Sequence, residues 1–319
     1  MENTATTNKL SLIFGDYTLG VKAKDTHYIF SYVKGGLESL NKGGKEWLYR
    51  EVKPVFWRAM TDNDRGCGFD FQSNMWLGAS LKQKLSKTTV TIDGQSIQLP
   101  TAPTNNRYSN AETAEEITIS FTLAINTVPQ TSVVISYTIN AQAEMKVSMH
   151  YFGQEGLPEL PALGVRFIMP TPAKYFEYEG LSGETYPDRL AGGIPGTYRI
   201  AGLPVTPYLV PQECGMHMQS KAVKIVREQT LNNADQTKNE FSLEILQDQA
   251  PFAFSALPYK AEELEFATHQ EELPPARRTV LCVYAKVRGV GGIDSWGTDV
   301  TAPYRIDATK DYEVSFIVK

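Results

Sequence analysis

The sequence has few cysteines, no long apolar run and no excess of basic residues. Its three cysteines lie far apart in 319 residues and are odd in number, which excludes a disulfide framework or a zinc spacing and favours a reducing, cytoplasmic compartment. No apolar stretch approaches the roughly 20 residues that a membrane span needs. With 31 basic and 36 acidic residues the net charge is −5, which argues against a nucleic acid or an anionic membrane as the partner.

The sequence also lacks the common catalytic motifs. It contains no G-x-S-x-G nucleophile elbow, no H-E-x-x-H zinc motif, no P-loop and no dinucleotide-binding fingerprint. Its four histidines are scattered, and His150 falls on the polar side of an alternating segment, which favours a solvated strand position over a metal ligand. We therefore assign no catalytic residue, no metal ligand and no cofactor to this chain.

Alternation of apolar and polar residues is the dominant pattern and predicts β-strands. The segments that show it are 117–123, 133–139, 145–151, 241–246 and 312–318. Residues 279–287 are more continuously apolar, as expected of a central strand covered on both faces. Asp93 and Gly94 separate two short strand-like runs and predict a two-residue hairpin within a meander over 82–151.

Helices are expected to be few. Helical spacing favours one around residues 75–85 and a shorter one at 261–268. The chain is therefore predicted to be all-β with a sandwich-like architecture. No repeat or linker divides it, so we expect a single domain over 10–319, preceded by a disordered or frayed N-terminus at 1–9 without a secretory signal.

Four segments are unusually rich in glycine, proline, acidic and aromatic residues: 54–68, 178–189, 207–215 and 289–298. The first contains an acidic run followed by two glycines, which permit positive φ angles. It is either a tight loop that caps its own backbone or a hinged loop at a ligand site. The residues concerned are Asp62, Asn63, Asp64, Gly66 and Gly68.

The third and fourth segments each allow a structural and a binding interpretation. Gln212 and Glu213, beside Tyr208, either line a sugar pocket or satisfy backbone groups. Trp296 lies in a glycine-rich turn after the most apolar strand. A loop tryptophan is often buried against the core, but an exposed indole is also a platform for the apolar face of a sugar ring.

Taken together and in order, these segments resemble the C-terminal domain of β-galactosidases of the lactose-operon type. The chain is similar in particular to the small subunits of heterodimeric β-galactosidases, in which one polypeptide is divided into two chains. The resemblance runs from about Leu10 to Lys319. The matching residues are Phe56–Ala59, Thr61–Asp64, Gly66, Gly180, Leu181, Glu184, Tyr186–Arg189, Pro207, Tyr208, Pro211–Glu213, Gly215, His269, Gly291, Gly292 and Asp294–Trp296.

The resemblance implies a large antiparallel β-supersandwich of the galactose mutarotase-like class. It implies retaining hydrolysis of terminal β-D-galactosides such as lactose, with the catalytic carboxylates, Mg²⁺ and Na⁺ on a separate large subunit. It further implies that Trp296 stacks on the aglycone sugar at the active-site mouth. The implied substrate-binding residues are Asp294, Ser295 and Trp296, and the implied mobile active-site loop contains Asp62, Asn63, Asp64, Gly66 and Gly68.

Two other functions stay open beside that of a β-galactosidase small subunit bound to its large catalytic subunit. A free-standing mutarotase-like epimerase would need a histidine acid and a carboxylate base, yet neither Glu184 nor Glu213 has a histidine paired with it in the sequence. A carbohydrate-binding module would bind sugar without a partner. The small-subunit interpretation is preferred, because it accounts for all four segments in order.

Overall fold

The computed structural model describes residues 9–100, 105, 107, 112–235 and 237–319. Apart from Lys9, the N-terminus that we predicted to be disordered lies outside the described residues. The described strands form three sheets, and all their strand pairs are antiparallel. No helix in this described part of the chain has the length and hydrophobicity needed to cross a membrane.

One sheet, formed mostly by N-terminal strands, has six strands in the order β5-β4-β3-β2-β1-β9. Its members are β1 (Leu10–Phe14), β2 (Thr18–Ala23), β3 (Thr26–Ser31), β4 (Gly36–Lys42), β5 (Lys45–Glu46) and β9 (Thr113–Ala114). A second small sheet has five strands in the order β16-β19-β20-β13-β6. Its members are β6 (Lys53–Val55), β13 (Ala162–Met169), β16 (Met216–Ser220), β19 (Phe252–Leu257) and β20 (Thr279–Val287).

The large sheet has ten strands in the order β15-β14-β17-β18-β21-β12-β11-β10-β7-β8. Its members are β7 (Gln83–Ile92), β8 (Gln95–Ile97), β10 (Glu116–Ile125), β11 (Thr131–Asn140), β12 (Met145–Tyr151), β14 (Tyr175–Leu181), β15 (Pro195–Ala201), β17 (Ala222–Arg227), β18 (Phe241–Gln247) and β21 (Tyr312–Val318). All the predicted strands are present, and Asp93 and Gly94 form the predicted hairpin turn with φ angles of 47° and 80°.

Alternation sets which face of each strand is buried. Where β10 pairs with β11, Ile119 lies opposite Tyr137 and Ser120 lies opposite Ser136. The isoleucine and tyrosine side chains are fully buried, whereas the two serine hydroxyls bond each other at 2.7 Å on the other face. The predicted central strand β20 is buried along most of its length, as its continuous apolar sequence requires.

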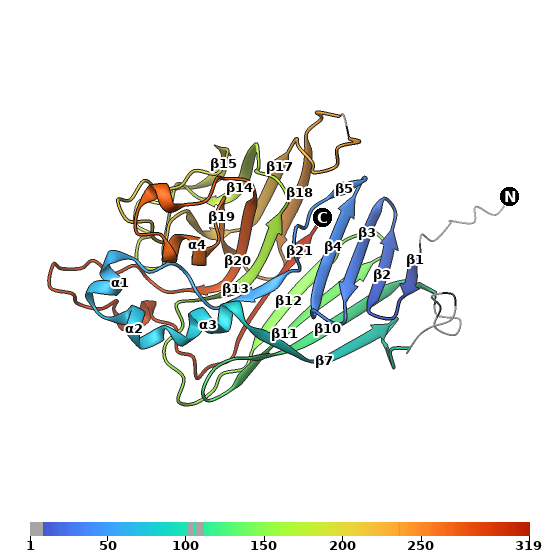
Figure 1. Cartoon of the computed structure of the whole chain (residues 1–319), viewed down its shortest axis with the longest axis horizontal. Helices are drawn as coiled ribbons and strands as arrows, with labels where there is room; N and C mark the ends of the chain where they lie inside the picture. Colours follow the sequence, from blue (N-terminus) through green and yellow to red (C-terminus); the bar gives the residue numbers. More distant parts are fainter. Residues whose placement is uncertain (1–8, 101–104, 106, 108–111, 236) are drawn as a thin grey trace.

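The two small sheets pack against one face of the large sheet, with the six-stranded sheet lying in front of β10–β12 in Figure 1. Phe30 of the six-stranded sheet contacts Tyr137 with ring centroids 5.2 Å apart. Phe167 of the five-stranded sheet contacts Phe316 at 6.0 Å. One hydrophobic core therefore extends through all three sheets, and the predicted antiparallel β-supersandwich is confirmed.

In the part of the chain that the structure describes, four short α-helices lie outside the sheets: α1 (Asp62–Gly66), α2 (Phe69–Ser73), α3 (Met75–Leu81) and α4 (Ala261–Phe266). The helices predicted at 75–85 and 261–268 correspond to α3 and α4. Helix α3 ends at Leu81 because the chain enters β7 at Gln83. Helices α1–α3 cluster at the end of the molecule opposite β1 (Figure 1).

Candidate functional site

The four segments singled out in the sequence meet at one cleft. The first segment contains α1, and the fourth belongs to the chain between β20 and β21, which passes beside α1 in Figure 1. Together they enclose a cleft of about 410 Å³. Its lining residues are Thr61, Asp62, Asn63, Glu184, Tyr186, Arg189, Tyr208, Gln212, Glu213 and Val290. Each segment contributes at least one of them, so the fold unites residues far apart in the sequence, such as Asn63 and Val290, which are 227 positions apart.

A short helix replaces part of the predicted loop. Helix α1 begins at Asp62 and is capped by Thr61. The Thr61 hydroxyl accepts a hydrogen bond from the Asp64 backbone N–H, and the Asp64 carboxylate accepts one from the Thr61 N–H. Gly68, with a φ of 76°, then leads into α2. The tight or hinged loop expected here is therefore partly helical: Asp62, Asn63, Asp64 and Gly66 lie in α1. The mobility expected for this segment stays a prediction.

Asp64 does not face the cleft as a ligand-binding group but anchors α1 in the interior. Its carboxylate accepts hydrogen bonds from Arg58 at 2.7 and 3.2 Å and from Arg288 at 3.1 Å. Burial opposes ionisation of Asp64, but Arg58 and Thr61 outweigh it and hold the pKa of this carboxyl below its usual value. Since Arg288 directly follows β20, the cluster joins α1 to the start of the loop that carries Trp296.

The floor of the cleft is polar and buried. Burial raises the pKa of the Glu213 carboxyl to about 8, with Arg58 acting in the opposite direction. The neighbouring Tyr186 is buried too, and its hydroxyl has no hydrogen-bond partner within the described structure. Gln212 accepts a hydrogen bond from the Asp62 backbone N–H at 3.0 Å, so it satisfies a backbone group as one of the two interpretations expected. It also lines the cleft, and binding of a sugar there stays a prediction.

The predicted substrate-binding residues Asp294, Ser295 and Trp296 lie together on an exposed turn. The Asp294 carboxylate accepts hydrogen bonds from the backbone N–H groups of Trp296 and Thr298 at 3.0 and 3.2 Å, which closes the turn. Ser295 is exposed, and the Trp296 side chain is 91% exposed. The indole thus takes the exposed position of the two that the sequence allowed, as a sugar-stacking platform requires.

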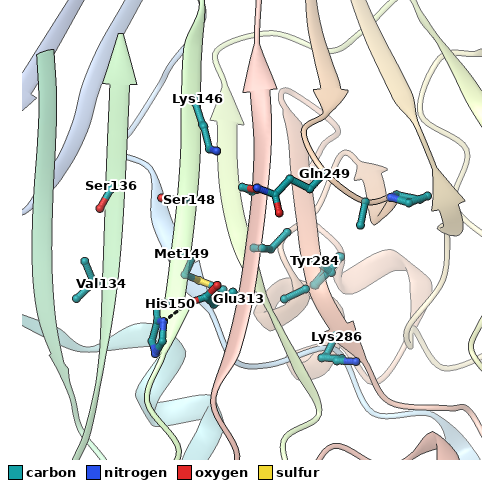
Figure 2. Close-up of a pocket in the computed structure, with 15 residues that line it drawn as sticks. Val134, Ser136, Lys146, Ser148, Met149, His150, Gln249, Tyr284, Lys286 and Glu313 are labelled. Carbon is teal, nitrogen blue, oxygen red and sulfur yellow. Dashed lines mark hydrogen bonds and ion pairs between the residues drawn. The ribbon is translucent and has the colours of Figure 1, made fainter. Parts of the chain in front are cut away.

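A second hollow is lined by β11, β12 and β21 of the large sheet, by β20 of the five-stranded sheet and by residues 249–251, and Figure 2 shows its lining. His150 points toward Glu313 there, on the polar face of β12, as predicted for a solvated strand histidine. None of the residues predicted for the site lines this hollow. Within the described residues, no group of three or more histidine, cysteine or acidic side chains is arranged to hold a metal ion.

Sequence reasoning missed the partners that hold the site together. Arg288 and Asp299 bond each other, and Glu265 accepts hydrogen bonds from the Trp57 indole at 3.2 Å and the Met60 N–H at 2.7 Å. Arg288, Asp299 and Glu265 stand outside any recognisable motif. A charged residue directly after the most apolar strand, as Arg288 is, was the one local signal that could have revealed its role.

The chain is similar in sequence to known β-galactosidases. The chain is 58% identical over 317 residues to a β-galactosidase small subunit from Latilactobacillus sakei, covering 98% of this chain and 100% of that protein. It is 30% identical over 312 residues to a β-galactosidase from Halalkalibacterium halodurans, of which it spans only 28%. Among solved structures, a galactose mutarotase-like protein from Lactobacillus casei aligns over 97% of this chain and 99% of its own, at 10% identity and a TM-score of 0.42.

The family assignment rests on a match over nearly the whole described chain. Residues 22–318 fit the family model described as the β-galactosidase small chain. That range contains the three sheets except β1 and most of β2, and it contains all four segments that line the cleft. The chain belongs to the β-galactosidase small-chain family.

Proposed function

We propose that this chain is the small subunit of a β-galactosidase, which binds a larger catalytic subunit and completes the mouth of its active site. The proposal rests on how much of each relative's length this chain matches. The chain matches the whole of a protein named as a small subunit but only 28% of longer β-galactosidases such as that of H. halodurans. The remaining part of those longer proteins is what the partner chain would supply.

Trp296 is the residue proposed to touch the substrate. Its indole extends from a turn that Asp294 closes, and almost all of its surface is exposed. An aromatic ring of this kind stacks on the apolar C–H face of a sugar, and such a contact contributes on the order of 1 kcal/mol. We assign it to the aglycone sugar, where a stacked glucose is held either as leaving group or as acceptor for galactosyl transfer.

The chemistry belongs to the partner in this proposal. In a retaining mechanism one carboxyl group protonates the glycosidic oxygen and a second attacks the anomeric carbon, with the two about 5 Å apart. Both groups, and the Mg²⁺ and Na⁺ expected with them, are placed on the large subunit. The proposed location is the cytoplasm, which is supported by three cysteines that are all free thiols.

Co-expression with a β-galactosidase large subunit tests the proposal. Lactose hydrolysis should need both chains, and Trp296→Ala should raise KM for lactose more than KM for an aryl galactoside, whose leaving group is not a sugar. Tyr17→Ala is the matched control, because Tyr17 is another exposed aromatic side chain (68%) but lies beside the six-stranded sheet.

Three results would contradict the proposal. Equal loss on both substrates would remove the aglycone role of Trp296. A chain that never associates with a large subunit would remove the subunit role. Titration showing tight lactose binding by this chain alone, with no effect of the partner, would favour a carbohydrate-binding module instead.

A further inference from the structure

The loop that carries Trp296 is held at its base from two sides. Val290 stands near the start of this loop, and both its backbone polar groups are bonded to side chains from distant segments. Its N–H donates to the Asp188 carboxylate at 3.0 and 3.1 Å, and its carbonyl accepts from the Asn63 amide at 2.9 Å. The Gly291 N–H also donates to Asp188, at 2.9 Å. Asp188 and Asn63 thus hold Val290 from two sides, and we call this pair of side chains the clasp.

The glycines of the loop fit this clasp closely. A Cβ atom on Gly289 would lie 2.8 Å from the Asp188 carboxyl carbon, and one on Gly292 would lie 2.7 Å from the Asn63 amide nitrogen. Gly291 and Gly292 have φ angles of 67° and 72°, which favour glycine. The loop backbone at Gly289 and Gly292 therefore lies so close to the Asp188 and Asn63 side chains that a larger residue would collide with them.

The clasp opposes a natural tendency of the loop. An indole that is 91% exposed gains free energy by folding back onto the protein surface. Asp294 closes the turn locally but makes no contact that fixes the turn to the body of the protein. The contacts at Val290 and Gly291 fix the start of the loop to the body of the protein, where Asp188 is only 7% exposed.

We infer that Asp188 and Asn63 are positioning residues that set the aglycone specificity of the enzyme by holding the Trp296 loop outward. This inference rests on the proposed function of Trp296. Neither side chain needs to touch substrate. They should affect kcat/KM for lactose only by fixing the position of the Trp296 indole. A binding group that is already in place costs less free energy to order when the ligand binds.

A double-mutant cycle in the two-subunit enzyme tests this route. Asp188→Ala should lower kcat/KM for lactose roughly tenfold and change the value for an aryl galactoside far less. Adding Asp188→Ala to Trp296→Ala should cause no further loss, because both changes act through one contact. Asn140→Ala is the matched control: its side chain accepts two backbone N–H bonds, at 3.0 and 3.1 Å, in the turn between β11 and β12.

A second measurement keeps the test independent of substrate. Of the four tryptophans, Trp47, Trp57 and Trp76 are at most 2% exposed, so iodide quenching of the full chain reports on Trp296. Asp188→Ala should reduce this quenching as the indole folds back. If that variant fails to fold, Asn63→Asp replaces it, because it removes the donor to Val290 and sets a carboxylate against that carbonyl, at an exposed side chain.

The outcomes separate the two proposals. Additive losses in the cycle, or unchanged quenching in folded clasp variants, would overturn the clasp while leaving the role of Trp296 intact. Lactose kinetics that Trp296→Ala leaves unchanged would overturn the proposed role of Trp296, and quenching would then still decide whether Asp188 positions the loop.

Discussion

Asp64 accepts two hydrogen bonds from Arg58, at 2.7 and 3.2 Å, and neither side chain is more than 1% exposed. Arg288, equally buried, bonds the same carboxylate at 3.1 Å. The Asp64 carboxylate therefore contacts two guanidinium groups in the interior, and Arg288 forms a second ion pair with Asp299. Breaking such a buried cluster by removing one partner leaves an unpaired charge, which is far more costly than losing a surface pair.

Asp64→Asn should therefore destabilise the chain by about 3–5 kcal/mol, because two buried arginines lose their shared partner. Urea denaturation measures the effect as a lower midpoint at an unchanged slope. Glu179→Gln is the matched control, since Glu179 pairs with Lys221 at 2.8 Å but both side chains are about half exposed. The control should lose at most about 1 kcal/mol. Equal losses in the two variants would show that the Asp64 cluster does not hold the fold.

Much of the fold could be predicted from local sequence. Strict alternation marks β10, β11 and β12, and a two-residue turn of Asp93 and Gly94 marks the β7–β8 hairpin. Helix α1 was not predicted, because five residues are too few to show helical periodicity. Its start signal, Thr61 with Asp64 three positions later, uses Asp where the usual capping box has Glu or Gln.

The site could be predicted only in part. The resemblance pointed to residues in all four segments, and the structure brings at least one residue of each segment to one cleft. The predicted substrate-binding residues Asp294, Ser295 and Trp296 do not line that cleft. What joins them follows from three-dimensional pairing, which spacing does not encode. Asp188 and Val290 are 102 positions apart, and Arg58 bonds the Gly289 carbonyl across 231 positions. Nothing in the sequence near Asp64 indicated that it faces two arginines rather than a ligand.

His217 should make the chain sensitive to mild acid. It is buried between the rings of Tyr178 and Phe254, and its Nδ1 lies 3.0 Å from the Gly183 carbonyl, to which it must donate. Burial lowers its pKa to about 4, against an ordinary value of 6.5. The unfolded chain therefore binds a proton before the folded chain does, and stability falls as the pH drops from 6.5 toward 4.

The expected loss from this one group is about 2 kcal/mol between pH 7 and pH 5. His217→Phe keeps an aromatic ring in the same place and cannot take up a proton. Its stability should start lower at pH 7, because the bond to Gly183 is lost, but should change less between the two pH values. Urea midpoints at both pH values give the comparison. An equally steep fall in the variant would show that other groups cause the acid sensitivity.

Glu213 should act in the opposite direction. Burial raises its pKa from 4.5 to about 8, so the folded chain keeps the proton that the unfolded chain has released. Stability should therefore fall as the pH rises from 4.5 to 8, by about 2 kcal/mol between pH 6 and pH 8. Glu213→Gln has a similar shape and no titratable proton, so its stability should be flatter over this range. A variant that falls as steeply as the wild type would contradict this assignment.

Gly297 should link the Trp296 turn to α1 by close backbone contact. A Cβ atom at this position would lie 2.8 Å from the Gly66 carbonyl oxygen, and the φ of 79° already disfavours any other residue. Gly297→Ala should therefore separate the turn from the end of α1 and lower the free energy of unfolding. Iodide quenching of Trp296, or the preference for lactose over an aryl galactoside, should fall with it. Gly44→Ala is the matched control, because Gly44 has a φ of 77° but open space where the Cβ would be. That control should lose about 1 kcal/mol from backbone strain alone and leave Trp296 unaffected. Equal behaviour of the two variants would mean that strain, not contact with Gly66, governs the turn.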